Sequence, residues 1–190
     1  MKTKIDIRQL SLEELTAKIK ALGEKKFRAK QVHEWLWKKR AIDFSQMTNL
    51  SKSLRNLLEE NFIINGILLK EAQKSKDKTI KNAFLLSDQS VIEGVLIPTK
   101  KRMTACVSVQ VGCSLDCAFC ATGKLKRVRN LNADEIYDQV VMINEQSINE
   151  YEIPISNIVY MGMGEPLLNY NSVIKSIDKI TSPDGLGMSP

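Results

Sequence analysis

Three of the four cysteines in the sequence lie close together, and Cys113, Cys117 and Cys120 spell C-x-x-x-C-x-x-C. In a reducing compartment, clustered cysteines are typical of metal or redox chemistry rather than of structural disulfides. Three thiolates on one short loop can hold a [4Fe–4S] cluster and leave its fourth iron without a protein ligand. The amino and carboxylate groups of S-adenosylmethionine (SAM) can chelate that iron, and an electron from the cluster can then cleave a carbon–sulfur bond. The spacing therefore favours a cluster that acts on SAM.

A structural zinc site is the main alternative for these cysteines, and it needs four ligands. Cys106 could be the fourth ligand, but it lies seven residues before Cys113, which is an unusual spacing. His33 is the single histidine, is remote in sequence, and is expected on the solvent side of a helix. Unligated core cysteines would not explain the spacing, so the cluster is favoured over zinc.

A second segment with chemical potential is Met161-Gly-Met-Gly-Glu-Pro166, which follows a short apolar stretch. Glycines allow the backbone to approach a ligand closely, and a carboxylate can accept hydrogen bonds from an ammonium group. A Gly-x-Gly pattern alone marks any tight turn. Its position after the cysteine segment makes it a candidate ligand-binding turn.

The net charge of +6 comes from 28 basic and 22 acidic residues and is compatible with an acidic partner such as RNA. Basic residues mixed with aromatic residues fit phosphate contacts and base stacking. The alternative is a solvated helix face with the tryptophans in the core, and both stay open for the first cluster. The three clusters are Lys25, Lys26, Arg28, Lys30, Lys38, Lys39 and Arg40 with Trp35 and Trp37; Lys100, Lys101 and Arg102; and Lys124, Lys126, Arg127 and Arg129.

The first part of the chain predicts short helices followed by strands. Ser11-Leu-Glu-Glu14 is a capping box, and leucines and isoleucines follow it at helical spacing. Further helices are expected over 27–39, with Val32, Trp35 and Leu36 as candidate buried positions, and over 51–61. Alternating or β-branched residues then predict strands over 67–73, 79–86, 91–97 and 104–111.

The second part of the chain predicts parallel β-α-β units. A capping box at Asn132-Ala-Asp-Glu135 opens a long amphipathic helix, an apolar strand covers 157–161, and a helix covers 171–180. This order predicts an α/β fold, with a helical accessory domain over 1–98 and the first two βα units of a partial barrel over 99–190. Two such units cannot close a barrel, so the sequence is expected to be a fragment that stops at Ser189-Pro190.

The composition and the distribution of apolar residues indicate the general class of the protein. The chain is 43% hydrophobic and 26% charged, so a packed core is expected. No apolar run approaches the length of a membrane span, and residues 1–10 lack the apolar core of a signal peptide. We therefore expect a soluble cytoplasmic protein that does not associate with membranes.

The motifs together resemble one known family. The segment from Cys106 to Gly123 (CVSVQVGCSLDCAFCATG) and the segment from Met161 to Asn169 (MGMGEPLLN) closely resemble the RlmN/Cfr family of radical SAM RNA methyltransferases. Residues 23–37 (GEKKFRAKQVHEWLW) and 47–51 (MTNLS) are similar to the helical accessory domain of that family. The resemblance covers essentially the whole chain.

The resemblance implies methylation of carbon 2 of adenine in 23S rRNA, and beside the anticodon of some tRNAs. It implies that Cys113, Cys117 and Cys120 hold a [4Fe–4S] cluster, and that SAM is contacted by Gly164, Glu165 and, at its adenine, Phe119. Cys106 matches a cysteine that helps to resolve a covalent RNA–enzyme intermediate by forming a disulfide. Glu93 matches a proton acceptor. The expected partners are the two RNAs and a reductant protein such as flavodoxin, and a monomer is expected.

In the mechanism that the resemblance implies, a second cysteine carries the methyl group, and this cysteine would lie beyond Pro190. The 190-residue chain is therefore expected to be inactive alone. Within the family, methylation at adenine carbon 8 is the alternative. A non-catalytic RNA-binding module and a zinc-binding structural protein are the alternatives from other classes.

Overall fold

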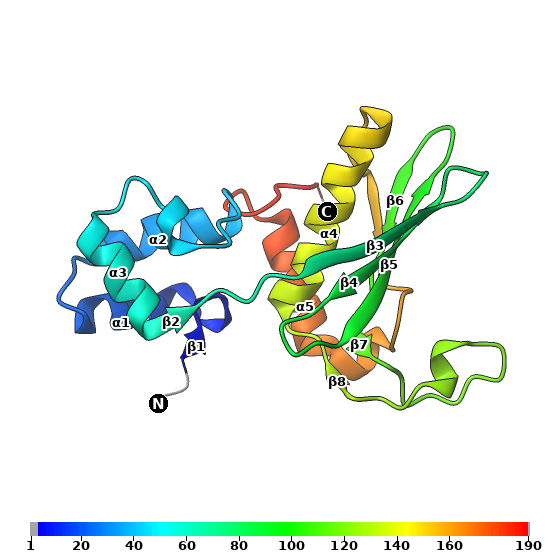
Figure 1. Cartoon of the computed structure of the whole chain (residues 1–190), viewed down its shortest axis with the longest axis horizontal. Helices are drawn as coiled ribbons and strands as arrows, with labels where there is room; N and C mark the ends of the chain where they lie inside the picture. The colour runs from blue at the N-terminus through cyan, green and yellow to red at the C-terminus, as the bar shows by residue number, and fades with distance from the viewer. Residues whose placement is uncertain (1–3, 190) are drawn as a thin grey trace. The chain divides into compact units, whose positions relative to one another are not determined.

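The computed structural model describes residues 4–189, and its chain forms two compact units. Of the described residues, 4–65 and 178–189 form unit 1 and 66–177 form unit 2 (Figure 1). The expected boundary after Pro98 differs from this division. It falls inside the sheet of unit 2, between two strands that are hydrogen-bonded to each other. A boundary there would divide a continuous sheet, so the strands predicted over 67–97 belong with the cysteine segment.

Unit 1 is built from short helices and one small parallel sheet. The predicted capping box is confirmed, because the Ser11 hydroxyl accepts from the N–H of Glu14 and the Glu14 carboxylate accepts from the N–H of Ser11. Fully buried apolar side chains from each helix, such as Leu15, Val32 and Leu54, form the core. The elements are β1 (Ile5–Asp6), η1 (Ile7–Gln9), α1 (Leu12–Ala21), α2 (Phe27–Trp37), η2 (Phe44–Gln46), α3 (Lys52–Asn61) and β2 (Phe62–Ile63), and β1 pairs with β2.

The structure separates the two tryptophans of α2. Trp37 is 3% exposed and belongs to the core, whereas Trp35 is half-buried and donates a hydrogen bond to Asn49. The expectation that Trp35 is the buried residue was therefore wrong. Of the two tryptophans, Trp35 alone is partly accessible. The ammonium of Lys39 lies 4.2 Å from the centroid of the Trp35 ring. The sequence left open whether the tryptophans of the first basic cluster are available for base stacking or lie in the core. Trp37 lies in the core.

Unit 2 is a five-stranded mixed sheet in the order β3-β4-β5-β6-β9. The first four strands are antiparallel neighbours, and β9 is parallel to β6 with α4 as the crossover between them. The predicted β-α-β unit is therefore confirmed. The elements are β3 (Leu68–Lys74), β4 (Ile80–Leu85), β5 (Val91–Pro98), β6 (Met103–Cys106), β7 (Gln110–Val111), η3 (Thr122–Lys124), β8 (Arg129–Asn130), α4 (Ala133–Tyr151), β9 (Asn157–Val159), η4 (Pro166–Asn169) and α5 (Tyr170–Thr181), of which the last residues, from 178 on, belong to unit 1.

The single strand predicted over 104–111 is two strands in the structure, β6 and β7, with residues 107–109 between them. The break follows from Ser108. Its backbone N–H donates to the side chain of Gln139 at 2.9 Å, and its carbonyl accepts from the same side chain at 3.0 Å. Because both backbone groups of Ser108 are bonded to α4, they are not available to a neighbouring strand. After this break β7 pairs with β8 instead.

Among residues 4–189, no helix is long and apolar enough to cross a membrane.

His33 provides a test of the packing of unit 1. Its ring is half-buried, and its Nε2 lies 2.9 Å from Nζ of Lys179, so the expected solvent-side position was wrong. Burial, and then the nearby Lys179 charge, lowers the pKa of His33 to about 4. Because His33 is the sole histidine, one NMR signal should titrate with a midpoint near pH 4.

The same shift predicts a pH dependence of stability. Between about pH 6.5 and 4 the unfolded chain binds a proton at His33 that the folded chain does not, so the free energy of unfolding should fall as the pH falls through this window. His33→Gln, which carries no titrating group, should remove that part of the dependence. A histidine signal that titrates near pH 6.5 would contradict the buried position.

Candidate active site

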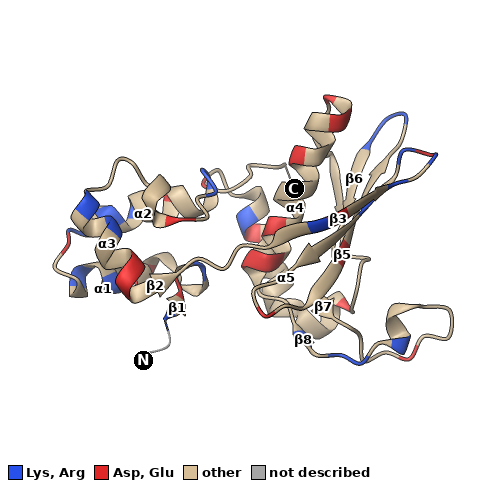
Figure 2. Cartoon of the chain, viewed as in Figure 1, with Lys and Arg blue, Asp and Glu red and all other residues tan. Residues whose placement is uncertain are grey.

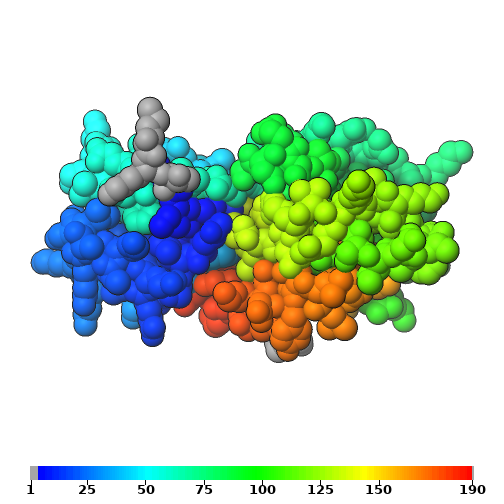
Figure 3. Space-filling view, turned by 90° about the horizontal axis from the view of Figure 1, so that it is seen from below, coloured from blue at the N-terminus to red at the C-terminus, as the bar shows by residue number. Residues whose placement is uncertain are grey.

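The cysteines and the glycine segment come together at one edge of the sheet. The cysteine loop, residues 112–128, follows β6 and β7, and the glycine turn, residues 160–165, follows β9. Because β6 and β9 are parallel, both segments leave the sheet at its carboxyl edge, where α/β proteins commonly bind ligands. The glycine turn is hydrogen-bonded to residues 107–110, directly before the cysteine loop, and Figure 3 shows the orange part of the chain that follows β9 beside the yellow-green part that follows β7.

The cysteine loop is closed at its base by the antiparallel pairing of β7 with β8. Gly112 lies at this closure with φ +73, and a Cβ there would lie 2.2 Å from the carbonyl oxygen of Lys126. Glycine is therefore needed at this position. Within the loop, the N–H of Cys120 donates to the carbonyl of Cys117 at 3.0 Å, and the N–H of Gly123 donates to the carbonyl of Cys120 at 3.1 Å. The loop thus has a defined backbone.

The three thiols of the loop are at least partly accessible. Cys113 and Cys120 are half-buried and Cys117 is exposed. Hydrogen bonds from the backbone N–H groups of Gly123 and Thr122 lower the pKa of Cys120, which favours the thiolate that binds metal. The N–H of Leu115 also donates to Sγ of Cys113 at 3.4 Å.

A set of three thiols on an eight-residue stretch fits an iron–sulfur cluster by its donor chemistry. Within the part of the chain that the structure describes, no three His, Cys, Asp or Glu side chains converge closely enough to hold a metal ion. The loop therefore supplies the donors, with their side chains not yet gathered around one point. Cys106 lies outside the loop, at the end of β6.

The glycine turn is fastened to the segment that leads into the cysteine loop. The carbonyl of Met163 accepts from the N–H groups of Val109 and Gln110, and the N–H of Gly162 donates to the carbonyl of Val107. The hydroxyl of Ser108 accepts from the N–H of Met163 at 2.8 Å. These bonds fix the position of the turn relative to the base of the cysteine loop.

Glu165 ends the glycine turn and begins η4. Its carboxylate accepts from the N–H of Leu167 at 3.1 Å, and its own N–H donates to Oε1 of Gln110 at 3.0 Å. Gly164 precedes it with φ +93, a conformation that favours glycine. The turn therefore places a carboxylate, preceded by a glycine with positive φ, next to the segment that leads into the cysteine loop.

Several buried polar residues that hold these segments were missed by the sequence analysis. Asn169 donates from Nδ2 to the carbonyls of Val109 and Leu131, both at 2.8 Å. The sequence signal that could have identified them is a polar residue within an otherwise apolar stretch. Such a residue needs a hydrogen-bond partner when it is buried. The residues missed are Ser108, Gln110, Gln139 and Asn169.

Cys106 and Glu93 lie on the same face of the sheet. Cys106 is directly opposite Val95 in the β5–β6 pairing, and Glu93 is two residues from Val95 along β5. The intervening Gly94 faces the other side, where a Cβ would lie 3.1 Å from Ile143 of α4. The sheet therefore carries the thiol and the carboxylate on the face that points away from α4.

The environments of these two groups differ. Cys106 is 9% exposed, and burial raises the pKa of its thiol. The Glu93 carboxylate is about half exposed and lies 2.6 Å from Nζ of Lys81 in a salt bridge. All four cysteines of the chain are free, so the expected disulfide bond has no support in this structure.

Phe119 is almost fully exposed, at 94%, although it was expected beside a bound adenine. It is one of several apolar side chains at this edge of unit 2 that lack cover. The others are Leu115, Leu125, Val128, Met161, Leu167 and Leu168.

One residue of the basic cluster at positions 124–129, Arg129, has a structural role. Arg129 forms salt bridges with Asp88 at 2.7 Å and Glu135 at 2.8 Å, so this guanidinium is engaged in the fold. Hydrogen bonds with these carboxylates raise the pKa of Arg129, and Arg129 holds the pKa of Asp88 at about 2. Figure 2 shows that basic residues occur along the backbone of both units.

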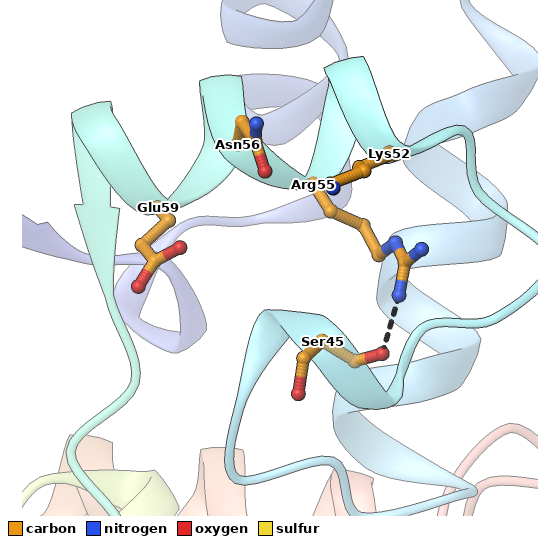
Figure 4. Close-up of a pocket in the computed structure, with 5 residues that line it drawn as sticks. All are labelled: Ser45, Lys52, Arg55, Asn56 and Glu59. Carbon is orange, nitrogen blue, oxygen red and sulfur yellow. Dashed lines mark hydrogen bonds between the residues drawn. The ribbon is translucent and has the colours of Figure 1, made fainter.

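Unit 1 contains a separate cavity of about 130 Å³ beside α3 (Figure 4). Lys52, Arg55, Asn56 and Glu59 come from one face of α3, and Ser45 comes from η2. Arg55 donates from Nη1 to the carbonyl of Ser45 at 2.6 Å, whereas its buried Nε has no hydrogen-bond partner among the described residues. The cavity combines two cations with one carboxylate and is compatible with an anionic group.

The contact between the glycine turn and residues 107–108 gives a testable prediction. A Cβ on Gly162 would lie 2.7 Å from the backbone N of Ser108 and from the backbone carbon of Val107. Because these are backbone atoms, Gly162→Ala should displace the turn and lower the free energy of unfolding of unit 2 by about 1–3 kcal/mol. Urea denaturation measures this change in the free energy of unfolding.

Met161→Ala, which alters a side chain that is 79% exposed, is the control and should change stability little. Equal stability of the two variants would contradict the close contact.

Comparison with known proteins identifies relatives of this chain. The family "Ribosomal RNA large subunit methyltransferase N-terminal domain" matches residues 5–64. "Probable dual-specificity RNA methyltransferase RlmN" of Christiangramia forsetii is 61% identical over 98% of this chain and 53% of its own length. "Dual-specificity RNA methyltransferase RlmN" of Geotalea uraniireducens is 43% identical over 98% of this chain and 52% of its own length.

A solved structure extends the comparison to three dimensions. The crystal structure of a radical SAM methyltransferase from Sphaerobacter thermophilus is 35% identical, with a TM-score of 0.83 over 97% of this chain and 54% of that chain. The chain spans about half the length of the curated relatives it matches. The chain is therefore similar over nearly its whole length to proteins named RlmN, and its residues 5–64 match the N-terminal domain of ribosomal RNA large subunit methyltransferases.

Proposed function

We propose that the protein to which this chain belongs is a radical SAM RNA methyltransferase that methylates carbon 2 of adenine in 23S rRNA and in tRNA next to the anticodon. The observation that carries the proposal is the meeting of the cysteine loop and the glycine turn at the carboxyl edge of β6 and β9. The names of the relatives support an RNA methyltransferase, and the name of the structural neighbour supports radical SAM chemistry.

The residues of the site divide into three roles. Cys113, Cys117 and Cys120 would hold a [4Fe–4S] cluster that, with SAM bound, supplies one-electron cleavage of a carbon–sulfur bond. The Glu165 carboxylate would accept hydrogen bonds from the SAM amino group, because it is an acceptor fixed at the end of the glycine turn. Gly164 would let the SAM molecule approach the backbone.

Cys106 and Glu93 would act on the RNA intermediate. Burial raises the pKa of Cys106, so that this residue stays a thiol at neutral pH and holds a proton that it can give. The Glu93 carboxylate is partly exposed and can accept a proton once Lys81 moves aside. Their position on one face of the sheet, away from α4, supports a shared role.

The remaining parts of the proposal concern architecture and partners. We assign the sheet from β6 onward to the first part of a partial barrel, and the accessory RNA-binding role to unit 1. A soluble electron donor such as flavodoxin would reduce the cluster, and RNA substrates of this kind imply work in the cytoplasm. Methylation at adenine carbon 8 would use the same residues, so product analysis of the full-length protein distinguishes the two.

Cluster binding is the first prediction of this proposal. After anaerobic incubation with iron and sulfide, the chain should bind about four iron atoms and show broad visible absorbance. Cys117→Ala should lose the cluster, because two thiolates remain on the loop. Cys106→Ala should retain it, because Cys106 lies outside the loop, and this variant is the matched control. A colourless protein that binds one zinc and needs Cys106 would support the structural zinc alternative instead.

RNA binding by unit 1 is the second prediction. If a phosphate group lies in the cavity of Figure 4, Lys52→Gln should weaken binding of an rRNA fragment and reduce the slope of log affinity against log salt by about 0.7–1. Glu59→Gln removes the carboxylate from the same cavity and should strengthen binding. Filter binding at several salt concentrations measures both. Two variants that bind like the wild type would exclude this cavity as a phosphate contact.

A further inference from the structure

Gln110 is a fully buried polar side chain between the cysteine loop and the glycine turn. It lies in β7, three residues before Cys113, and has 0% exposure. A buried amide is stabilising only when its donor and acceptor atoms are both bonded. The partners of this amide connect the two halves of the candidate active site.

The acceptor atom of Gln110 reaches the glycine turn. Its Oε1 accepts from the backbone N–H of Glu165 at 3.0 Å, and its own backbone N–H donates to the carbonyl of Met163 at 3.1 Å. A Cβ on Gly164 would lie 2.5 Å from Cβ of Gln110. The glycine turn is therefore wrapped directly against the Gln110 side chain.

The donor atom of Gln110 reaches the other end of the cysteine loop. Its Nε2 donates to Oδ1 of Asn130 at 2.8 Å, in β8. The same oxygen accepts from Nη2 of Arg127 at 2.9 Å, and Nδ2 of Asn130 donates to the carbonyl of Leu168 at 3.1 Å. One pair of amides thus joins both strands at the base of the cysteine loop to the turn and to η4.

We propose that Gln110 is a positioning residue that fixes Glu165 relative to the cysteine loop and thereby sets the affinity for SAM. The inference rests on the proposed function, because it takes the cluster and SAM to occupy this edge of the sheet. Gln110 does not contact the reacting atoms in this account. It acts through the backbone of Glu165 and through Asn130.

Amide hydrogen exchange of the cofactor-free chain tests the positioning directly. Gln110→Met keeps the length of the side chain but removes both hydrogen bonds, so exchange over residues 163–169 should accelerate about tenfold. Asn82→Leu is the matched control. Asn82 is 1% exposed and forms two hydrogen bonds with Gln146, far in sequence from the turn. It should leave exchange over 163–169 unchanged, and unchanged exchange in Gln110→Met would overturn the proposal.

Gln110→Glu separates a hydrogen-bonding role from mere filling of space. It keeps an acceptor for the N–H of Glu165 and loses the donor to Asn130, so protection of the Glu165 amide should largely return. If Gln110→Glu and Gln110→Met behave alike at this amide, the side chain only fills space and the proposal is wrong.

SAM affinity completes the test. In the anaerobically reconstituted and reduced chain, the EPR spectrum of the cluster should change on addition of SAM, and Gln110→Met should raise the half-saturating concentration about tenfold, with Asn82→Leu unaffected. Equal affinity in Gln110→Met and wild type would overturn the link to SAM. If the wild-type cluster forms and SAM has no effect, the proposed SAM site fails, whereas the exchange results still decide whether Gln110 fixes the turn.

Discussion

The hydrogen bonds between residues 107–110 and the glycine turn are the constraint on which the candidate site depends. β6 and β9 are parallel neighbours for only three residue pairs, which is a short length of ladder. Beyond the ladder, the chain continues its contact through the carbonyl of Met163, the hydroxyl of Ser108 and the amide of Gln110. Because of these bonds, the segments that follow β6 and β9 stay next to each other beyond the sheet, where a ligand would bind.

This arrangement explains why so many polar side chains are buried near the carboxyl edge of the sheet. Backbone groups that leave a regular ladder need other partners when they are buried. Gln139 provides them for Ser108, and Asn169 provides them for Val109 and Leu131. A loop held in this way is restricted at its base, while its thiols and Phe119 remain accessible.

The elements with local signals were predictable from sequence, and those set by distant partners were not. The capping boxes at Ser11 and Asn132 involve residues three apart, and both were correctly predicted. The break after Cys106 depends on Gln139, 31 residues after Ser108, so alternation alone predicted one continuous strand. The burial of Trp37, which the sequence left open, also involves a distant partner, because Lys179 packs on the Trp37 ring from the far end of the chain. Likewise, the cysteine spacing indicated which thiols could bind a metal. It did not indicate that, among the described residues, these side chains do not converge on one point.

The central claim is that the cysteine loop and the glycine turn form one site, in which the three thiolates would hold a cluster and the turn would bind SAM. Electron–nuclear double resonance of the reduced, reconstituted chain with SAM that is labelled with ¹⁵N at its amino group tests this claim most directly. The account predicts a ¹⁵N hyperfine coupling to the cluster, because the amino group would bind iron beside Glu165. A fully formed cluster with SAM present and no such coupling would contradict it.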